Sequence, residues 1–168
     1  MFSGIAASYI RNCRCIVMIL SNIPPLVGAL LINYEPTSHK LTRLAGVYIL
    51  LTMTISYIMV MSMVASNFAG MSRKTTVSAG MFIAYSAGNL VAPQLFISSE
   101  APRYQTGFRG MIASFVALIV LALLLMLYLT WENRKRDRKY GKVDVNKPQE
   151  DDFLNKTDRE LAYFRYTW

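Results

Sequence analysis

Apolar residues along the chain gather in four long runs, near residues 15–33, 44–65, 77–97 and 110–131. Each run holds about 20 residues, the length of an α-helix that spans the hydrocarbon core of a bilayer. The segments between the runs are short and hold the charges, prolines and turn-forming residues that the runs lack. The pattern predicts an all-α, polytopic membrane protein with four transmembrane helices.

Composition agrees with this class. The 168 residues are 54% hydrophobic and 17% charged, whereas a soluble domain carries about 25% charged residues. Most charges of both signs lie in residues 132–168, so the net charge of +8 does not indicate a nucleic-acid partner. We therefore divide the chain into a short start (1–14), a transmembrane region (15–131) and a charged tail (132–168).

Positive charge sets the orientation. With four crossings both termini lie on one side, and the short segments of that side hold Arg11, Arg14, Arg73 and Lys74, followed by a basic cluster at 134–139. The opposite side has Lys40, Arg43, Arg103 and Arg109. Because Lys and Arg are in excess on the cytoplasmic face of membranes, both termini and the 67–75 loop are predicted to be cytoplasmic.

The third run carries a stripe of small residues and a proline. Gly80, Ala84 and Gly88 recur every four residues and share one face, which lets another helix backbone come close. Pro93 removes a backbone hydrogen bond near the outer end and is predicted to kink the helix. This face is therefore assigned to helix packing.

A different face of the same run is polar. Ser78, Phe82, Tyr85 and Asn89 fall close together at 100° per residue. Polar groups in a membrane helix face a neighbouring helix or a water-filled path. Asn89, with Tyr85 as second candidate, either lines a transport path or forms a structural hydrogen bond to another helix. Periodicity does not decide between these two interpretations.

The cytoplasmic loop also has two interpretations. Asn67 opens it, and Gly70 permits a tight turn. Arg73 and Lys74 either pair with a carboxylate or with helix carbonyls when an inner gate closes, or simply reflect the excess of positive charge on the inside.

Residues 67–111 resemble the stretch from the tenth to the twelfth membrane helix in the fungal allantoate permease family, within the major facilitator superfamily. The residues that carry the resemblance are Asn67-x-x-Gly70, Arg73-Lys74 with Thr75 and Thr76, Gly88-Asn89, Pro93-Gln94-x-Phe96, Ala101-Pro102-x-Tyr104 and Gly107. Weaker similarity extends over nearly the whole chain. Two departures are Met71-Ser72, where the family often has His-Thr, and Ala92, where it commonly has glycine.

The resemblance implies a partial major facilitator fold. Such transporters have two halves with substrate between them near mid-membrane. The four helices would be the ninth to twelfth, residues 1–10 would end the eighth, and the amino-terminal half would be missing. The chain would then be a carboxy-terminal fragment, from a truncated gene product or an incomplete gene model. An intact relative would be a symporter in the plasma membrane, taking up small organic anions such as allantoate or nicotinate together with protons.

Catalysis finds no support in the residue pattern. His39 is the single histidine and lies in a loop, so neither a His-rich metal cluster nor a Ser/His/Asp triad is predicted inside the membrane. Cys13 and Cys15 lack the second pair of a zinc site. We expect no enzyme activity, no cofactor and no metal. The alternative to a transporter fragment is a stand-alone four-helix scaffold or partner protein in the lipid bilayer.

Overall fold

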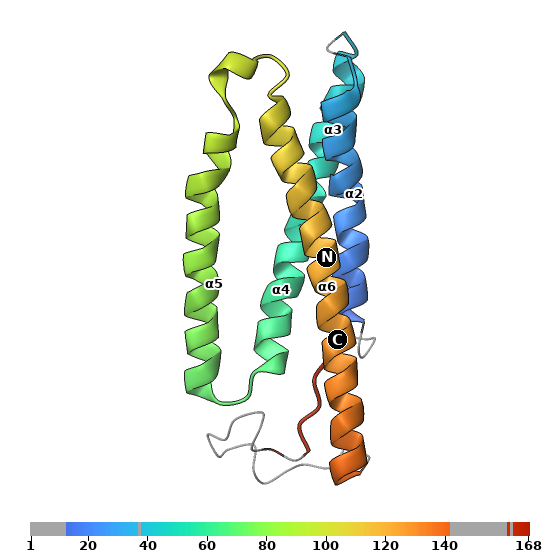
Figure 1. The fold of residues 1–168 in the computed structure, drawn as a ribbon, viewed down its shortest axis with the longest axis vertical. Helices are drawn as coiled ribbons and strands as arrows, with labels where there is room; N and C mark the ends of the chain where they lie inside the picture. Colours follow the sequence, from blue (N-terminus) through green and yellow to red (C-terminus); the bar gives the residue numbers. More distant parts are fainter. Residues whose placement is uncertain (1–12, 37, 142–160, 162) are drawn as a thin grey trace.

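The computed structural model describes residues 13–36, 38–141, 161 and 163–168, and all regular structure in these residues is helical. The elements are α2 (Arg14–Tyr34), α3 (Lys40–Leu50), η1 (Leu51–Met53), α4 (Thr54–Asn67), α5 (Met71–Val91), η2 (Ala92–Leu95), η3 (Ser98–Glu100) and α6 (Gln105–Tyr140). α3, η1 and α4 follow one another without a gap, so the elements form four long rods along one axis (Figure 1). The prediction of an all-α fold is confirmed.

Three rods are long and apolar enough to cross a membrane: Arg14–Tyr34, Lys40–Asn67 and Gln105–Tyr140. α5 has 21 residues, which suffices in length, but it is less apolar and does not belong to this group. The crossing by α5 therefore stays a prediction.

Two element boundaries differ from the sequence pattern. α5 begins at Met71, so the connection after α4 is much shorter than the predicted loop at 67–75. α6 continues to Tyr140, so the charged tail predicted from residue 132 starts as helix. Hydrophobicity marks only the part of a helix inside the bilayer, whereas backbone hydrogen bonding continues beyond it. Predictions that concern residues 1–12 and 142–160 lie outside the described residues.

α2 lies at the centre of the packing, between the α3–α4 rod and α6. Its closest approach to α3 uses one glycine from each helix. A Cβ atom built on Gly28 would lie 2.7 Å from the carbonyl oxygen of Gly46, and one built on Gly46 would lie 2.8 Å from Cγ1 of Ile32. Only glycine allows the two backbones to come this close.

A small core joins α2, α4 and α6. Met18, Met59 and Ala122, one from each helix, are buried against one another. Next to this cluster the hydroxyls of Ser21 and Ser56 share a hydrogen bond of 2.8 Å between α2 and α4. The apolar contacts and the hydroxyl pair together hold the three helices in register.

We call the end of the bundle where α2 begins and α4 ends the basal end, at the bottom of Figure 1, and the opposite end the apical end. At the apical end the connection from α5 folds back onto α6. The amide of Thr106 donates to a carboxylate oxygen of Glu100 at 2.8 Å, and its hydroxyl donates to the other. These bonds lower the pKa of Glu100, the hydroxyl contributing most. The carboxylate thereby caps the first turn of α6.

α5 stands apart from the other rods over most of its length (Figure 1). None of its residues is buried. One side-chain contact with α4 is the ring pair Tyr57 and Tyr85, with centroids 5.5 Å apart. The faces of α5 are thus almost entirely open within the described part of the chain.

Candidate functional site

Tyr85 and Asn89 lie on α5, as their spacing predicts, and both are exposed. The ring of Tyr85 turns toward Tyr57 of α4. The Asn89 amide nitrogen donates to the carbonyl oxygen of Tyr85 in its own helix at 3.0 Å. This bond uses the donor side of the Asn89 carboxamide, and no donor in the described part of the chain meets its oxygen. The substrate-contact role of both residues stays a prediction.

The small residues of α5 face open space. A Cβ atom built on Gly80 or on Gly88 would meet no described atom within 4 Å apart from the nearby backbone of its own helix. Ala84 is exposed. The described helices of this chain therefore do not pack on this stripe, and its predicted packing role would need a partner from elsewhere. α-Helical geometry gives way to the η2 turn at Ala92, next to Pro93.

The four residues predicted for the cytoplasmic loop lie in three different places in the structure: the end of α4, the turn after it and the start of α5. Gly70 has φ 85°, which supplies the turn between α4 and α5. Arg73 and Lys74 lie in the first turns of α5 rather than in a loop. Asn67 is the last residue of α4, is buried, and bonds to the far end of the chain.

The residues bonded to Asn67 belong to a segment that we call the terminal strap, residues 163–168. The strap runs along the lower part of α6 (Figure 1). Asn67 donates from Nδ2 to the carbonyl oxygen of Thr167 at 2.9 Å and accepts from the Thr167 amide at 2.7 Å. Asn133 of α6 does the same for Tyr166, at 2.7 Å and 2.9 Å. Two carboxamides from two helices thus each hold the backbone of one strap residue.

Arginines add further bonds to the strap. Arg136 of α6 is buried and donates to the carbonyl oxygen of Phe164 at 3.3 Å and to the hydroxyl of Tyr166 at 3.1 Å. Its guanidinium also pairs with Glu132 at 3.4 Å. Arg165 of the strap forms an ion pair with Asp137, with Nε and Oδ1 2.7 Å apart. The strap is therefore fixed by charge-assisted as well as neutral hydrogen bonds.

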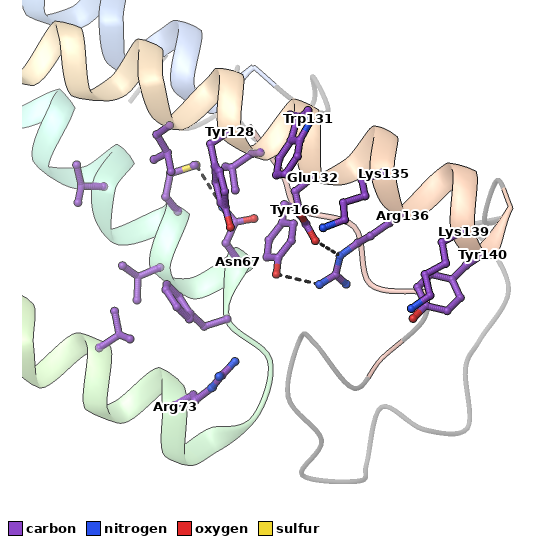
Figure 2. Close-up of a pocket in the computed structure, with 17 residues that line it drawn as sticks. Asn67, Arg73, Tyr128, Trp131, Glu132, Lys135, Arg136, Lys139, Tyr140 and Tyr166 are labelled. Carbon is purple, nitrogen blue, oxygen red and sulfur yellow. Dashed lines mark hydrogen bonds and ion pairs between the residues drawn. The ribbon is translucent and has the colours of Figure 1, made fainter.

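A cavity of about 970 Å³ lies beside the strap, between the end of α4, the start of α5 and the end of α6. Figure 2 shows Arg73 on the α5 wall, with Lys135, Arg136 and Lys139 on the α6 wall. Nζ of Lys135 lies 5.2 Å from the ring centroid of Trp131. Of the described residues that line it, four are basic and only Glu132 is acidic, so this charged lining is mainly basic.

Among the described residues, no three His, Cys, Asp or Glu side chains come together as a possible metal site. His39 pairs with Glu35 at 3.2 Å at the apical end. The geometry of the basal end instead offers hydrogen bonding, positive charge and aromatic surface.

Comparison with known proteins connects this helical chain to transporters. It is 35% identical to an uncharacterised transporter of Schizosaccharomyces pombe over 99% of the chain and 32% of that protein. It is 31% identical to the MFS-type transporter cnsL of Penicillium expansum over 98% of the chain and 34% of that protein. It is also 33% identical to the allantoate permease of Saccharomyces cerevisiae over 89% of the chain and 27% of that protein. Over nearly its whole length the chain is therefore homologous to part of the fungal MFS-type transporters, an allantoate permease among them.

The chain spans about a third of the length of these MFS-type relatives. No protein-family model matches it, and no solved structure matches it significantly. The predicted resemblance to the allantoate permease family is confirmed. The three membrane-length apolar rods agree with a partial major facilitator fold and with a multi-pass membrane protein.

Sequence reasoning did not find the basal site. Arg136 falls within the predicted basic cluster at 134–139, but Asn133 was not among the predicted site residues, although the two lie three residues apart and so share one face of α6. An asparagine and an arginine at this spacing, just beyond an apolar run, were the available signal. Their partners in the strap are too distant in sequence to be read from a local pattern.

Proposed function

We propose that the chain is a segment of a secondary active transporter that takes up small organic anions, of the allantoate and nicotinate type, together with protons. The observation that carries the proposal is the similarity to transporters over nearly the whole chain, the yeast allantoate permease among them. These relatives are named as transporters, which points away from an enzyme. No observation favours the alternative of a stand-alone scaffold.

In this proposal α5 also crosses the membrane, as the third of four crossings along the chain. Both termini lie in the cytoplasm of a cell whose plasma membrane holds the intact protein. Basic residues at the basal end, Arg73 and the 134–139 cluster among them, support this orientation, because positive charge accumulates on the cytoplasmic side. A tag after residue 168 should therefore be labelled by antibody only in permeabilised cells.

Transport follows the alternating-access mechanism, in which one bundle rocks against another around a central site. The chain covers about a third of its relatives, so the missing amino-terminal half would complete that site. The open polar face of α5 with Tyr85 and Asn89 supports a substrate contact there, and the open stripe of Gly80, Ala84 and Gly88 supports packing against the missing half.

The test is a chimera in which this chain replaces the aligned part of the Saccharomyces cerevisiae allantoate permease. Yeast cells without their own permease should take up labelled allantoate through the chimera, and an uncoupler that dissipates the proton gradient should stop the uptake. The 168 residues alone should give none. A chimera that reaches the cell surface and carries neither allantoate nor another small carboxylate would contradict the proposal, as would uptake by the chain alone.

Asn89→Leu in the active chimera tests the substrate contact. Uptake should fall about fivefold, because a lost hydrogen bond of about 1 kcal/mol corresponds to about a fivefold loss in binding. Ser86→Ala is the matched control, since Ser86 is a polar residue of the same helix outside the proposed contact, with its hydroxyl 2.9 Å from the Phe82 carbonyl oxygen. Equal uptake by Asn89→Leu at equal surface expression would remove the contact role.

A further inference from the structure

The terminal strap is recognised mainly through its backbone. Asn67 pairs with the amide and carbonyl of Thr167, and Asn133 pairs with the amide and carbonyl of Tyr166. A carboxamide that donates and accepts at one residue reproduces the pairing that a neighbouring β-strand would offer. The two asparagines therefore bind the peptide backbone at two successive residues.

Three helices contribute to this recognition. The backbone amide of Arg14, at the start of α2, donates to the carbonyl oxygen of Trp168 at 3.2 Å. The Arg14 guanidinium donates to the Thr167 hydroxyl and to the Ser62 carbonyl oxygen of α4, both at 3.3 Å, and also to the Ser66 hydroxyl. With Asn67 on α4 and Asn133 on α6, the strap is bonded to α2, α4 and α6.

Apolar surface joins the same three helices to the strap. The side chains of Tyr166 and Trp168 pack against a buried cluster of Cys15, Met63 and Leu129, one residue from each helix. Aromatic residues bury a large apolar area at low cost in side-chain freedom. Figure 2 shows Tyr166 directed toward Arg136, whose guanidinium carbon lies 4.9 Å from the ring centroid.

The position of the strap gives it a mechanical role. α4 and α6 diverge toward the basal end, and the strap lies between them (Figure 1). Asn67 on one helix and Asn133 on the other bond to adjacent strap residues, so the peptide bridges the space that the divergence opens. Loss of the peptide would leave the buried carboxamide of Asn67 and the half-buried one of Asn133 without these partners.

We propose that the basal ends of α2, α4 and α6 form a recognition site for an extended peptide, that residues 163–168 of the same chain occupy it, and that the occupied site holds the three helix ends together as one unit. This inference goes beyond the transport function, and its test needs no transport substrate. The site reads two successive backbone units through Asn67 and Asn133 and accepts aromatic side chains beside them.

Hydrogen exchange of the full chain in lipid nanodiscs, resolved to single residues, tests the recognition. The amides of Tyr166 and Thr167 should exchange at least about tenfold more slowly than in a free peptide of residues 161–168, because each amide donates to a carboxamide oxygen. Exchange of both amides at the free-peptide rate in the unaltered chain would overturn the proposal.

Single substitutions assign the bonds. Asn67→Ala should speed exchange at Thr167 about tenfold, and Asn133→Ala should do so at Tyr166. Asn89→Ala is the matched control: it removes a carboxamide that bonds only within α5 and should leave the strap amides unchanged. Equal protection of the strap in all three variants would contradict the assigned contacts.

Truncation after residue 160 tests whether the strap joins the helices. Amides in the last turn of α4, up to Asn67, should exchange about tenfold faster, while those of the apical segment 107–114 keep their rates. If the truncated chain loses protection throughout, the same comparison is made with Thr167→Pro, which removes the single amide that donates to Asn67. An unchanged rate at the end of α4 would show that the strap binds without joining the helices.

Discussion

The contact between Gly28 and Gly46 gives a prediction whose magnitude follows from the geometry. In Gly28→Ala the new Cβ would lie 2.7 Å from a backbone oxygen of Gly46, whereas ordinary contacts begin at 3.4 Å. A backbone oxygen cannot rotate away as a side chain can, so α2 and α3 must separate by several tenths of an ångström. Overpacking of this kind costs about 1–3 kcal/mol.

Helix propensity acts in the opposite direction. Alanine is favoured over glycine within a helix by about 1 kcal/mol, so the net loss for Gly28→Ala is expected at about 0–2 kcal/mol. Gly80→Ala is the matched control, because its new Cβ would meet nothing within 4 Å and keeps only the gain in propensity. The difference between the two variants therefore isolates the contact, at about 1–3 kcal/mol.

The assay is reversible unfolding of the chain in detergent micelles by increasing SDS, followed by far-UV circular dichroism, for the unaltered chain and both variants. Gly28→Ala should unfold at a lower SDS fraction and Gly80→Ala at an equal or higher one. If Gly28→Ala proves as stable as Gly80→Ala, the close backbone approach of α2 and α3 does not exist in the folded chain.

Three further predictions concern separate parts of the molecule. In the chimera with the allantoate permease, Gly80→Leu should reduce folded surface expression at least about twofold, because the larger side chain would block packing of the Gly80, Ala84 and Gly88 stripe on the amino-terminal half. The same substitution should leave the stability of the isolated chain unchanged. Equal surface expression of the two chimeras would contradict this packing. The pKa of Glu100 is lowered, so its cap on Thr106 stabilises the start of α6 above the ordinary carboxyl pKa of about 4.3 and is lost as pH falls through the lowered value. After correction for intrinsic rates, protection of the Thr106 amide should fall as the pH is lowered below about 4.3 in the unaltered chain and be constantly low in Glu100→Gln; a pH-dependent Glu100→Gln variant would refute the cap. A double-mutant cycle of Ser21→Ala and Ser56→Ala should give a coupling free energy of about 0.6 kcal/mol, as expected for a hydroxyl pair between membrane helices; a value of zero within error would show that the bond contributes nothing.

The apolar runs could be read from the sequence because the bilayer imposes a length and a composition on any helix that crosses it. The three most apolar rods follow their runs closely, and the predicted all-α class rests on them. Helix ends outside the hydrocarbon leave no such mark. For that reason the continuation of α6 to Tyr140 and the start of α5 at Met71 were not predictable from hydrophobicity.

Helix packing was harder to predict than helix position. The four-residue spacing of Gly80, Ala84 and Gly88 predicts a packing face on α5, but in the described part of this chain that face is open. The observed close approach uses Gly28 on α2 and Gly46 on α3. A contact made by one glycine from each of two helices has no period along the sequence, so a pattern within one helix cannot reveal it.

The basal site was hidden for a related reason. Asn67 and Thr167 are 100 residues apart, and the bonds run from a side chain to the backbone, whose donors and acceptors are the same at every residue. Sequence shows that a carboxamide is present but not which backbone it meets. The sequence likewise does not show which surface the aromatic residues of the strap meet.

The asparagines of this chain show how environment decides the role of one side chain. Asn67 and Asn133 each use both the donor and the acceptor of the carboxamide on the strap. Asn89 uses only its donor, on its own helix, and the described part of the chain offers no donor to its oxygen. An amide oxygen without a partner is costly in hydrocarbon, so a face that carries one is expected to meet another protein surface or water rather than lipid. The open acceptor of Asn89 therefore supports the solute contact proposed above for α5, whereas the basal asparagines already use both groups on the strap.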